Sequence, residues 1–149
     1  MRRSLIATVI LGLIAIAAVP ASATLSLTPG EVRVLTPAPR AQDREPVFAA
    51  RVGTRYRFEV AYEVRGAPRI GTGHQFVFEN AVTGERRQIV SKSFPPEPAG
   101  AYTESREMTI PSDWAPGVYR FAWTLTARHP RLETVRRSGA GVFLVLPAA

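Results

Sequence analysis

Cysteine is absent from the 149 residues, and the chain holds only two histidines, two methionines and one lysine, Lys92. Without cysteine there is no disulfide, no thiolate metal site and no lipid-modified cysteine to anchor the protein. The two histidines, His74 and His129, lie too far apart for the His-x-His or His-x-x-x-His spacing of a metal site. We therefore predict no metal, no cofactor and a fold held together by its apolar core.

Residues for acid–base catalysis are also scarce. Nucleophilic catalysis needs a base beside the nucleophile, and His74, His129, Asp43 and Asp113 are the only histidines and aspartates. His74 follows Gly73 and is the one position where a base could sit beside backbone donors, but a lone histidine at a strand start is more often structural. The sequence predicts no catalytic residue and no enzyme.

The first 23 residues have the order of a secretory signal. Arg2 and Arg3 are followed by an uncharged apolar run from Leu5 to Val19 and then by Ala21-Ser22-Ala23. The run is about 15 residues, whereas a membrane-spanning helix needs about 20. We expect a signal helix in residues 1–23 that is cleaved after Ala23, giving a periplasmic or secreted protein without a permanent membrane span; an uncleaved anchor is the alternative.

The rest of the chain is moderately basic and large enough for one domain. Loss of Arg2 and Arg3 lowers the formal charge from +7 to +5. The arginines form two loose groups in sequence, residues 51–69 and residues 128–137. Brought together, they would make a basic face for an anionic glycan, a lipid headgroup or an acidic protein, but interleaved glutamates favour a mixed, solvated surface. Nucleic acid is not an expected partner of an exported chain.

Two-residue alternation of apolar and polar side chains predicts β-strands. It is strict from Arg55 to Val64 and again from Tyr119 to Leu125. The other expected strands are residues 32–35, 74–79, 86–93, 102–110 and 142–146. Proline- and glycine-rich segments separate them, including residues 66–73, the Pro95–Gly100 loop and the solvated connection expected at residues 129–138. The last strand is apolar on both faces, so we expect it to be covered on two sides, either inside the sheet stack or by a partner.

About seven short strands without an amphipathic helix indicate an all-β fold, a seven-strand immunoglobulin-like Greek-key sandwich preceded by the signal helix. We divide the chain into the signal (1–23), a Pro-rich lead-in with an edge strand (24–50) and the sandwich itself (51–149), the last two forming one domain. Asn80 to Gly84 is the clearest hairpin connection, because asparagine and glycine tolerate positive φ.

The segment from Pro116 to Trp123, Pro-Gly-Val-Tyr-Arg-Phe-Ala-Trp, resembles the Pro-Gly-x-Tyr start of a late strand in bacterial immunoglobulin-like and fibronectin-III-like domains. The resemblance implies a structural corner made by Pro116, Gly117, Tyr119 and Trp123. In such a corner the ring of Tyr119 is buried and its hydroxyl is bonded to backbone a few residues upstream.

Two inhibitor families on similar sandwiches share short stretches with this chain. Asn80-Ala81-Val82-Thr83-Gly84 is similar to the Asn-Pro-Thr-Thr-Gly loop of chagasin-type cysteine-protease inhibitors. In that family a glycine-rich loop follows the asparagine-containing loop, whereas Gly71-Thr72-Gly73 precedes it here, and the Arg-Pro-Trp segment of the family is absent. The Pro116 to Trp123 segment is also similar to part of the BsuPI-type proteinase inhibitors. The first of these resemblances implies an interaction loop with Asn80, Thr83 and Gly84 as its main residues.

The leading hypothesis is an exported, non-enzymatic module that binds another envelope or extracellular macromolecule, a protein or an anionic glycan, through its loops or a sheet edge. The alternative is a protease inhibitor that inserts a loop, residues 80–84 or 95–100, into an active-site cleft. An enzyme is the third possibility, and it requires His74 or His129 within hydrogen-bond reach of Asp, Glu or Ser inside a pocket.

Overall fold

The structure, a computed structural model, describes residues 23–38 and 40–149, and it is built from strands. Its elements are β1 (Ser26–Leu35), the short 3-10 helix η1 (Ala41–Asp43), β2 (Ala49–Arg51), β3 (Arg55–Asn80), β4 (Arg86–Ser93), β5 (Glu97–Thr109), β6 (Gly117–His129) and β7 (Leu132–Leu146). The predicted signal helix, apart from Ala23, lies outside the described residues. The all-β, seven-strand immunoglobulin-like class is confirmed.

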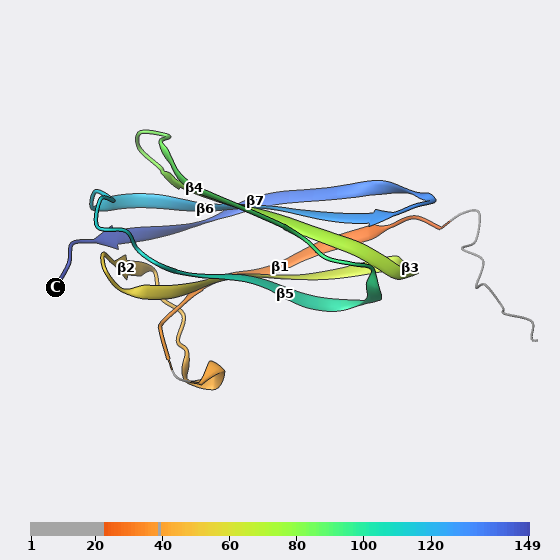
Figure 1. Cartoon of the computed structure of the whole chain (residues 1–149), viewed down its shortest axis with the longest axis horizontal. Helices are drawn as coiled ribbons and strands as arrows, with labels where there is room; N and C mark the ends of the chain where they lie inside the picture. The colour runs from red at the N-terminus through yellow and green to blue at the C-terminus, as the bar shows by residue number, and fades with distance from the viewer. Residues whose placement is uncertain (1–22, 39) are drawn as a thin grey trace, which may run out of the picture.

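The strands form two packed layers that share β3 (Figure 1). In the three-stranded sheet, β1 and β5 flank the first part of β3. In the five-stranded sheet the order is β4, the second part of β3, β6, β7 and β2. All pairs are antiparallel except β2 with β7. Each sheet therefore has one face against the other sheet and one outer face.

One expected interruption is wrong, because the strands predicted at residues 55–64 and 74–79 are a single strand, β3. The chain bends at Gly66, which has a φ of 107°, and the pairing with β5 shifts register between Val64 and Arg69. A Cβ at Gly66 would lie 2.0 Å from the Thr24 carbonyl oxygen. The glycine thus lets the strand pass from one sheet to the other instead of ending it.

Three further boundaries differ from the prediction. β1 is longer than residues 32–35 and contains Pro29, and β5 begins at Glu97 and contains Pro98, within the segment expected to be a loop. Both strands pair only with β3 and are edge strands, where proline is tolerated because its missing N–H faces away from the ladder. Residues 129–138 are not a solvated connection but the tight turn and first part of a β6–β7 hairpin.

The core lies between the sheets and is dominated by aromatic rings. Phe58 is fully buried, and its ring meets those of Phe78, Phe121 and Phe143 edge-on at centroid distances of 4.8 to 5.3 Å. Each buried ring of this kind contributes about 1.5–3 kcal/mol through removal of apolar surface from water. The predicted alternation of residues 55–64 and 119–125 is confirmed, since their aromatic positions face this core.

The last strand, β7, is not covered on both sides by the sheets, which was the first of the two expected arrangements; cover by a partner stays a prediction. Phe143 and Val145 are buried, but 60% of Val142 and 45% of Leu144 are exposed. The reason is position: β7 belongs to a two-layer sandwich, so only one of its faces meets the other sheet. Its outward apolar residues therefore lie on the surface of the described structure.

Candidate functional site

The outer face of the five-stranded sheet carries two different surfaces side by side. Strand register aligns its outward residues into cross-strand rows. We call two of them the hydroxyl rows: Ser91–Gln75–Thr124–Ser138 and Ser93–Gly73–Thr126–Arg136. The adjoining residues form the apolar rows: Ile89–Val77–Ala122–Ala140, followed by Val142 and the Val118–Leu144 pair. Hydroxyl groups and aliphatic groups thus occupy neighbouring halves of one face, and the Glu79–Arg120 ion pair lies in the row of Val142 within the aliphatic half.

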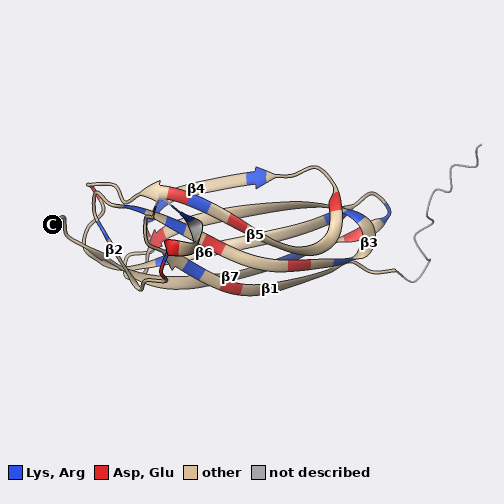
Figure 2. Ribbon diagram, turned by 90° about the horizontal axis from the view of Figure 1, so that it is seen from below, with Lys and Arg blue, Asp and Glu red and all other residues tan. Residues whose placement is uncertain are grey.

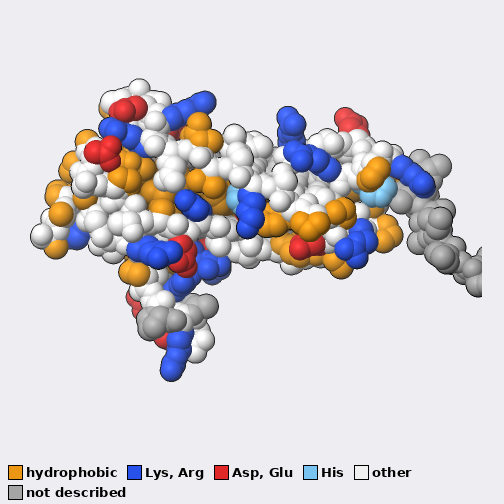
Figure 3. Space-filling model, viewed as in Figure 1, with side chains coloured by type: hydrophobic (Ala, Val, Ile, Leu, Met, Phe, Trp, Pro, Cys, Tyr) orange, Lys and Arg blue, Asp and Glu red, His pale blue; other side chains and the backbone are white. Residues whose placement is uncertain are grey.

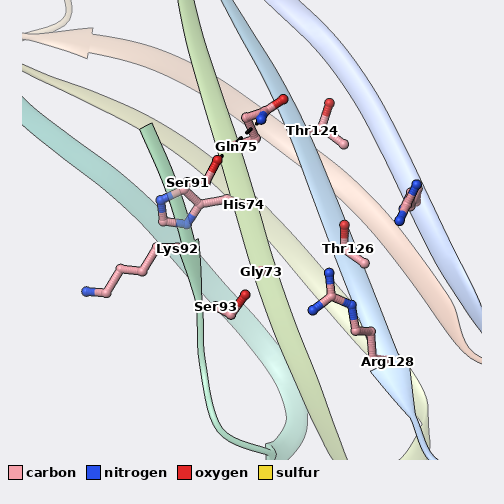
Figure 4. Close-up of a pocket in the computed structure, with 10 residues that line it drawn as sticks. Gly73, His74, Gln75, Ser91, Lys92, Ser93, Thr124, Thr126 and Arg128 are labelled. Atoms are coloured by element: carbon pink, nitrogen blue, oxygen red, sulfur yellow. Dashed lines mark hydrogen bonds between the residues drawn. The ribbon is translucent and has the colours of Figure 1, made fainter. Parts of the chain in front are cut away.

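The hydroxyl rows surround a hollow of about 300 Å³ (Figure 4). Gln75 Nε2 donates to Ser91 Oγ at 3.2 Å, and the hydroxyls of Thr124 and Ser138 are 2.9 Å apart. Arg128 and Arg136 add two guanidinium groups, whereas the side chain of Lys92 points away from them. The lining contains no carboxylate.

The apolar rows are the most exposed hydrophobic part of the sheet. Ile89, Val142 and Leu144 are 53%, 60% and 45% exposed. Phe48, which is 85% exposed, precedes β2, and its carbonyl accepts a hydrogen bond from the Leu144 amide at 2.9 Å. Aliphatic residues that gather on one exposed face in this way are typical of an interaction surface.

His74 lies in a buried polar cluster between the sheets. Its Nδ1 is 3.1 Å from Glu104 Oε2, an ion-pair distance without hydrogen-bond alignment. The Tyr62 hydroxyl contacts Glu104 Oε1 at 2.8 Å and Thr72 Oγ1 at 3.3 Å. Burial above all, together with the adjacent Glu104 carboxylate, raises the pKa of Tyr62 against the opposing effect of Thr72. His74 is thus within reach of a glutamate.

The surroundings of His74 are those of a packed core. Its ring stacks on Phe76 at a centroid distance of 4.3 Å and lies beside Phe94, and only 4% of its side chain is exposed. His129, the other histidine, accepts a hydrogen bond from the Arg131 amide in the β6–β7 turn. His74 also borders the hollow of the outer face, but its side chain is almost completely buried against these rings, so the geometry favours a structural role.

The predicted corner is only partly as expected. Tyr119 is fully buried and stacks on Trp114 at 4.9 Å, while Gly117 begins β6 and Pro116 is exposed before it. The Tyr119 hydroxyl and the Trp123 Nε1 are buried without a hydrogen-bond partner in the part of the chain that is described. The prediction of a tyrosine-corner hydrogen bond is therefore wrong, and stacking on Trp114 holds the Tyr119 ring in place instead.

The predicted interaction loop is a braced hairpin turn between β3 and β4. Asn80 Oδ1 accepts hydrogen bonds from the amides of Val82 and Thr83, Thr83 Oγ1 accepts one from the Glu85 amide, and Gly84 has a φ of 71°. Val82 is 84% exposed at its tip, and the hairpin stands out from the body in Figure 1. The hairpin itself is confirmed; its role in binding stays a prediction.

The two arginine groups do not form one basic face. Arg55 and Arg57 lie at the start of β3, whereas Arg128 pairs with Gly71 far along the same strand. Basic side chains are scattered along the length of the molecule in Figure 3. Three of the five arginines in the first group are ion-paired with glutamates: Arg55 with Glu107, Arg57 with Glu59 and Arg65 with Glu63. The mixed-surface interpretation is correct for this group.

The hydroxyl rows and the apolar rows were not predicted from the sequence. Ser91-x-Ser93 and Thr124-x-Thr126 are two-residue repeats of hydroxyl groups on predicted strands, and this signal could have marked one polar face. Within residues 23–38 and 40–149, no group of three or more His, Asp or Glu side chains is placed to hold a metal ion. Those residues also include no helix of the length and hydropathy needed to cross a membrane.

A scan against known protein families found no match, and neither did a search of the curated proteins. Among solved structures, the chain is similar to the CARDB domain of a protein from Pyrococcus furiosus, a structure described as a complex with di-metal ions. The identity is 13%, the match covers 83% of this chain and 90% of that chain, and the TM-score is 0.48. Function must therefore be argued from the geometry of the described residues.

Proposed function

We propose that this protein is an exported, non-enzymatic β-sandwich module that binds another envelope or extracellular macromolecule through the outer face of its five-stranded sheet. The observation that carries the proposal is the set of apolar rows, with Val142 and Leu144 exposed on β7 and Phe48 exposed just before the neighbouring strand β2. Export rests on the signal pattern of residues 1–23. Binding by such a module needs no cofactor.

The outward position of the apolar rows indicates that these residues serve binding and not the packing of the core. Val142 and Leu144 alternate with Phe143 and Val145, which already fill the core side of β7. The outward pair therefore adds little to the stability of the isolated chain and leaves aliphatic surface in water. A partner that covers Val142, Leu144 and Phe48 would gain the free energy of removing that surface from water.

The test introduces aspartate in place of exposed aliphatic residues at two sites, the apolar rows of β7 and the tip of the β3–β4 turn. Tagged full-length protein is expressed in an exporting host, and its mature N-terminus and co-purifying macromolecules are identified by mass spectrometry. We expect a mature chain that begins at Thr24. We also expect a partner that the Val142→Asp/Leu144→Asp variant loses and the Val82→Asp variant retains.

The opposite pattern favours the alternative function, a protease inhibitor that acts by loop insertion. The braced turn at residues 80–84 presents Val82 at 84% exposure, as a rigid inserted loop requires. Inhibition of a cysteine or serine protease that is lost in Val82→Asp, and unchanged in the β7 variant, would replace the binding-module proposal. The second loop considered, residues 95–100, is less suitable because its last four residues belong to β5.

A further inference from the structure

The hollow between the hydroxyl rows is a separate feature of the same face, and the proposed function does not use it. Four strands contribute to its lining: Gly73, His74 and Gln75 from β3, Ser91, Lys92 and Ser93 from β4, Thr124, Thr126 and Arg128 from β6, and Arg136 from β7. Gly73 keeps it open, because a Cβ there would lie 3.1 Å from the Lys92 carbonyl oxygen and 3.4 Å from Ser93 Oγ. Its volume of about 300 Å³ is at the lower end of small-molecule sites.

The polar groups of the hollow are suited to a negatively charged ligand. Seven arginines of the described chain are ion-paired with carboxylates, but Arg128 and Arg136 are not among them. No aspartate or glutamate lines the hollow to neutralise them. Guanidinium groups that converge with hydroxyl donors bind oxyanions through charge-assisted hydrogen bonds.

The uncharged residues of the lining indicate which kind of molecule bears the anionic group of the ligand. Gln75 with Ser91, and Thr124 with Ser138, form hydrogen-bonded pairs that hold an amide and three hydroxyls in place beside the two arginines. Such groups can each donate to and accept from the hydroxyls of a sugar. A free inorganic ion would engage the arginines but leave these neutral groups unused.

We propose that the hollow binds the oxyanion-bearing sugar unit of an anionic polysaccharide. Arg128 and Arg136 bind the sulfate, phosphate or carboxylate, and the hydroxyl rows bind the sugar ring that carries it. The inference concerns the same sheet face as the proposed function but depends on other residues, so each can fail without the other.

The experiment measures binding of sulfated dextran to the full chain by calorimetry, with neutral dextran, inorganic sulfate and anionic phospholipid vesicles as comparison probes. The test variant is Arg128→Gln/Arg136→Gln. Its matched control, Arg131→Gln/Arg137→Gln, removes the same two charges from the same hairpin but outside the hollow. Thr126→Val keeps the side-chain shape and removes one hydroxyl.

We expect sulfated dextran to bind and neutral dextran not to bind. The Arg128→Gln/Arg136→Gln variant should weaken binding at least about tenfold, because hydrogen bonds between charged groups are lost. The control pair should change it less than about threefold, because distant exposed charges are screened by salt. Thr126→Val should weaken it by roughly two- to tenfold, the value of one neutral hydrogen bond.

Other outcomes overturn the proposal. Equal losses in the two arginine pairs would mean general charge attraction without a site. Inorganic sulfate that binds as tightly as sulfated dextran would exclude the sugar part, and a preference for vesicles would assign the hollow to lipid headgroups. The uncharged Val142→Thr/Leu144→Thr variant should bind sulfated dextran normally. If it does so while no partner depends on the apolar rows, only the proposed function is lost.

Discussion

The outer faces of the two sheets both meet solvent, yet they carry opposite chemistry. On the three-stranded sheet, oppositely charged residues are neighbours: Glu59 lies between Arg33 and Arg57, and Glu107 contacts Arg44, Arg55 and Arg57. Figure 2 shows acidic and basic residues interspersed along these strands. On the five-stranded sheet, the outward positions of the hydroxyl and apolar rows hold mainly hydroxyls, an amide and aliphatic groups, with Arg136 in one hydroxyl row and the Glu79–Arg120 ion pair in the row of Val142.

This difference indicates that one surface serves the stability of the fold and the other serves binding. Charges that are already paired within the chain have their hydrogen bonds satisfied, and a partner would have to displace them. Uncharged hydroxyls, unpaired guanidiniums and exposed aliphatic groups have no such internal competitor. The charged part of the three-stranded face, around Glu59 and Glu107, is therefore a stabilising surface, and the hydroxyl and apolar rows of the five-stranded face are free to meet a ligand.

The largest effect is expected at Glu59. Only 9% of its side chain is exposed, and two arginines contact it. Glu59→Ala should lower the free energy of unfolding by about 3 kcal/mol, because it leaves two like charges without their partner. The matched control is Glu63→Ala, whose side chain is 41% exposed and paired with Arg65; it should cost less than about 1 kcal/mol. Urea denaturation at neutral pH measures both, and equal costs would remove the contrast between buried and exposed pairs.

Alternation correctly predicted the direction of Glu59 but not its burial. Period two in residues 55–64 places this residue on the outer face, as the structure has it. Its burial depends on Arg33, which lies 26 positions away in sequence and arrives through the β1–β3 register. The aliphatic part of an arginine side chain can cover a neighbouring residue, but which residue it covers depends on the strand register. The burial of Glu59 therefore cannot be predicted from sequence spacing alone.

The hydroxyl rows show the same limit for the candidate site. Each strand supplies one or two ordinary serines, threonines or glycines, and their chemistry emerges only when four strands align. The turn at residues 80–84 was easier to predict from the sequence, because its conformation is fixed by residues adjacent in sequence. Local features of this chain were thus predictable, whereas cross-strand features were not.

A smaller effect is expected in acid, from the charge network of the three-stranded face. A hydrogen bond from Arg44, together with the nearby Arg55 and Arg57, holds the pKa of Glu107 below its ordinary value of 4.5. The unfolded chain therefore binds this proton more readily than the folded chain. The stability from Glu107 is present above pH 4.5 and is lost as the pH falls through its lower folded-state pKa.

The measurement is the free energy of unfolding between neutral pH and about pH 3 for the wild type and Glu107→Gln. The wild type should lose up to about 1 kcal/mol more than the variant over this range, since a partly exposed pair is screened by solvent. Arg44→Gln should flatten the pH dependence in the same direction. Parallel curves for wild type and Glu107→Gln would mean that this network does not stabilise the folded state.

The smallest effect is expected on the five-stranded face. Val142→Thr/Leu144→Thr should change the free energy of unfolding by less than about 0.5 kcal/mol, because both residues are exposed and threonine is favourable in strands. The matched control is Val145→Thr on the inward side, which buries a hydroxyl and should cost about 1–3 kcal/mol. Thermal and urea denaturation of the purified chain measure both variants. A large loss in the outward pair would show that the apolar rows serve the fold, and the division between a stabilising face and a recognising face would no longer hold.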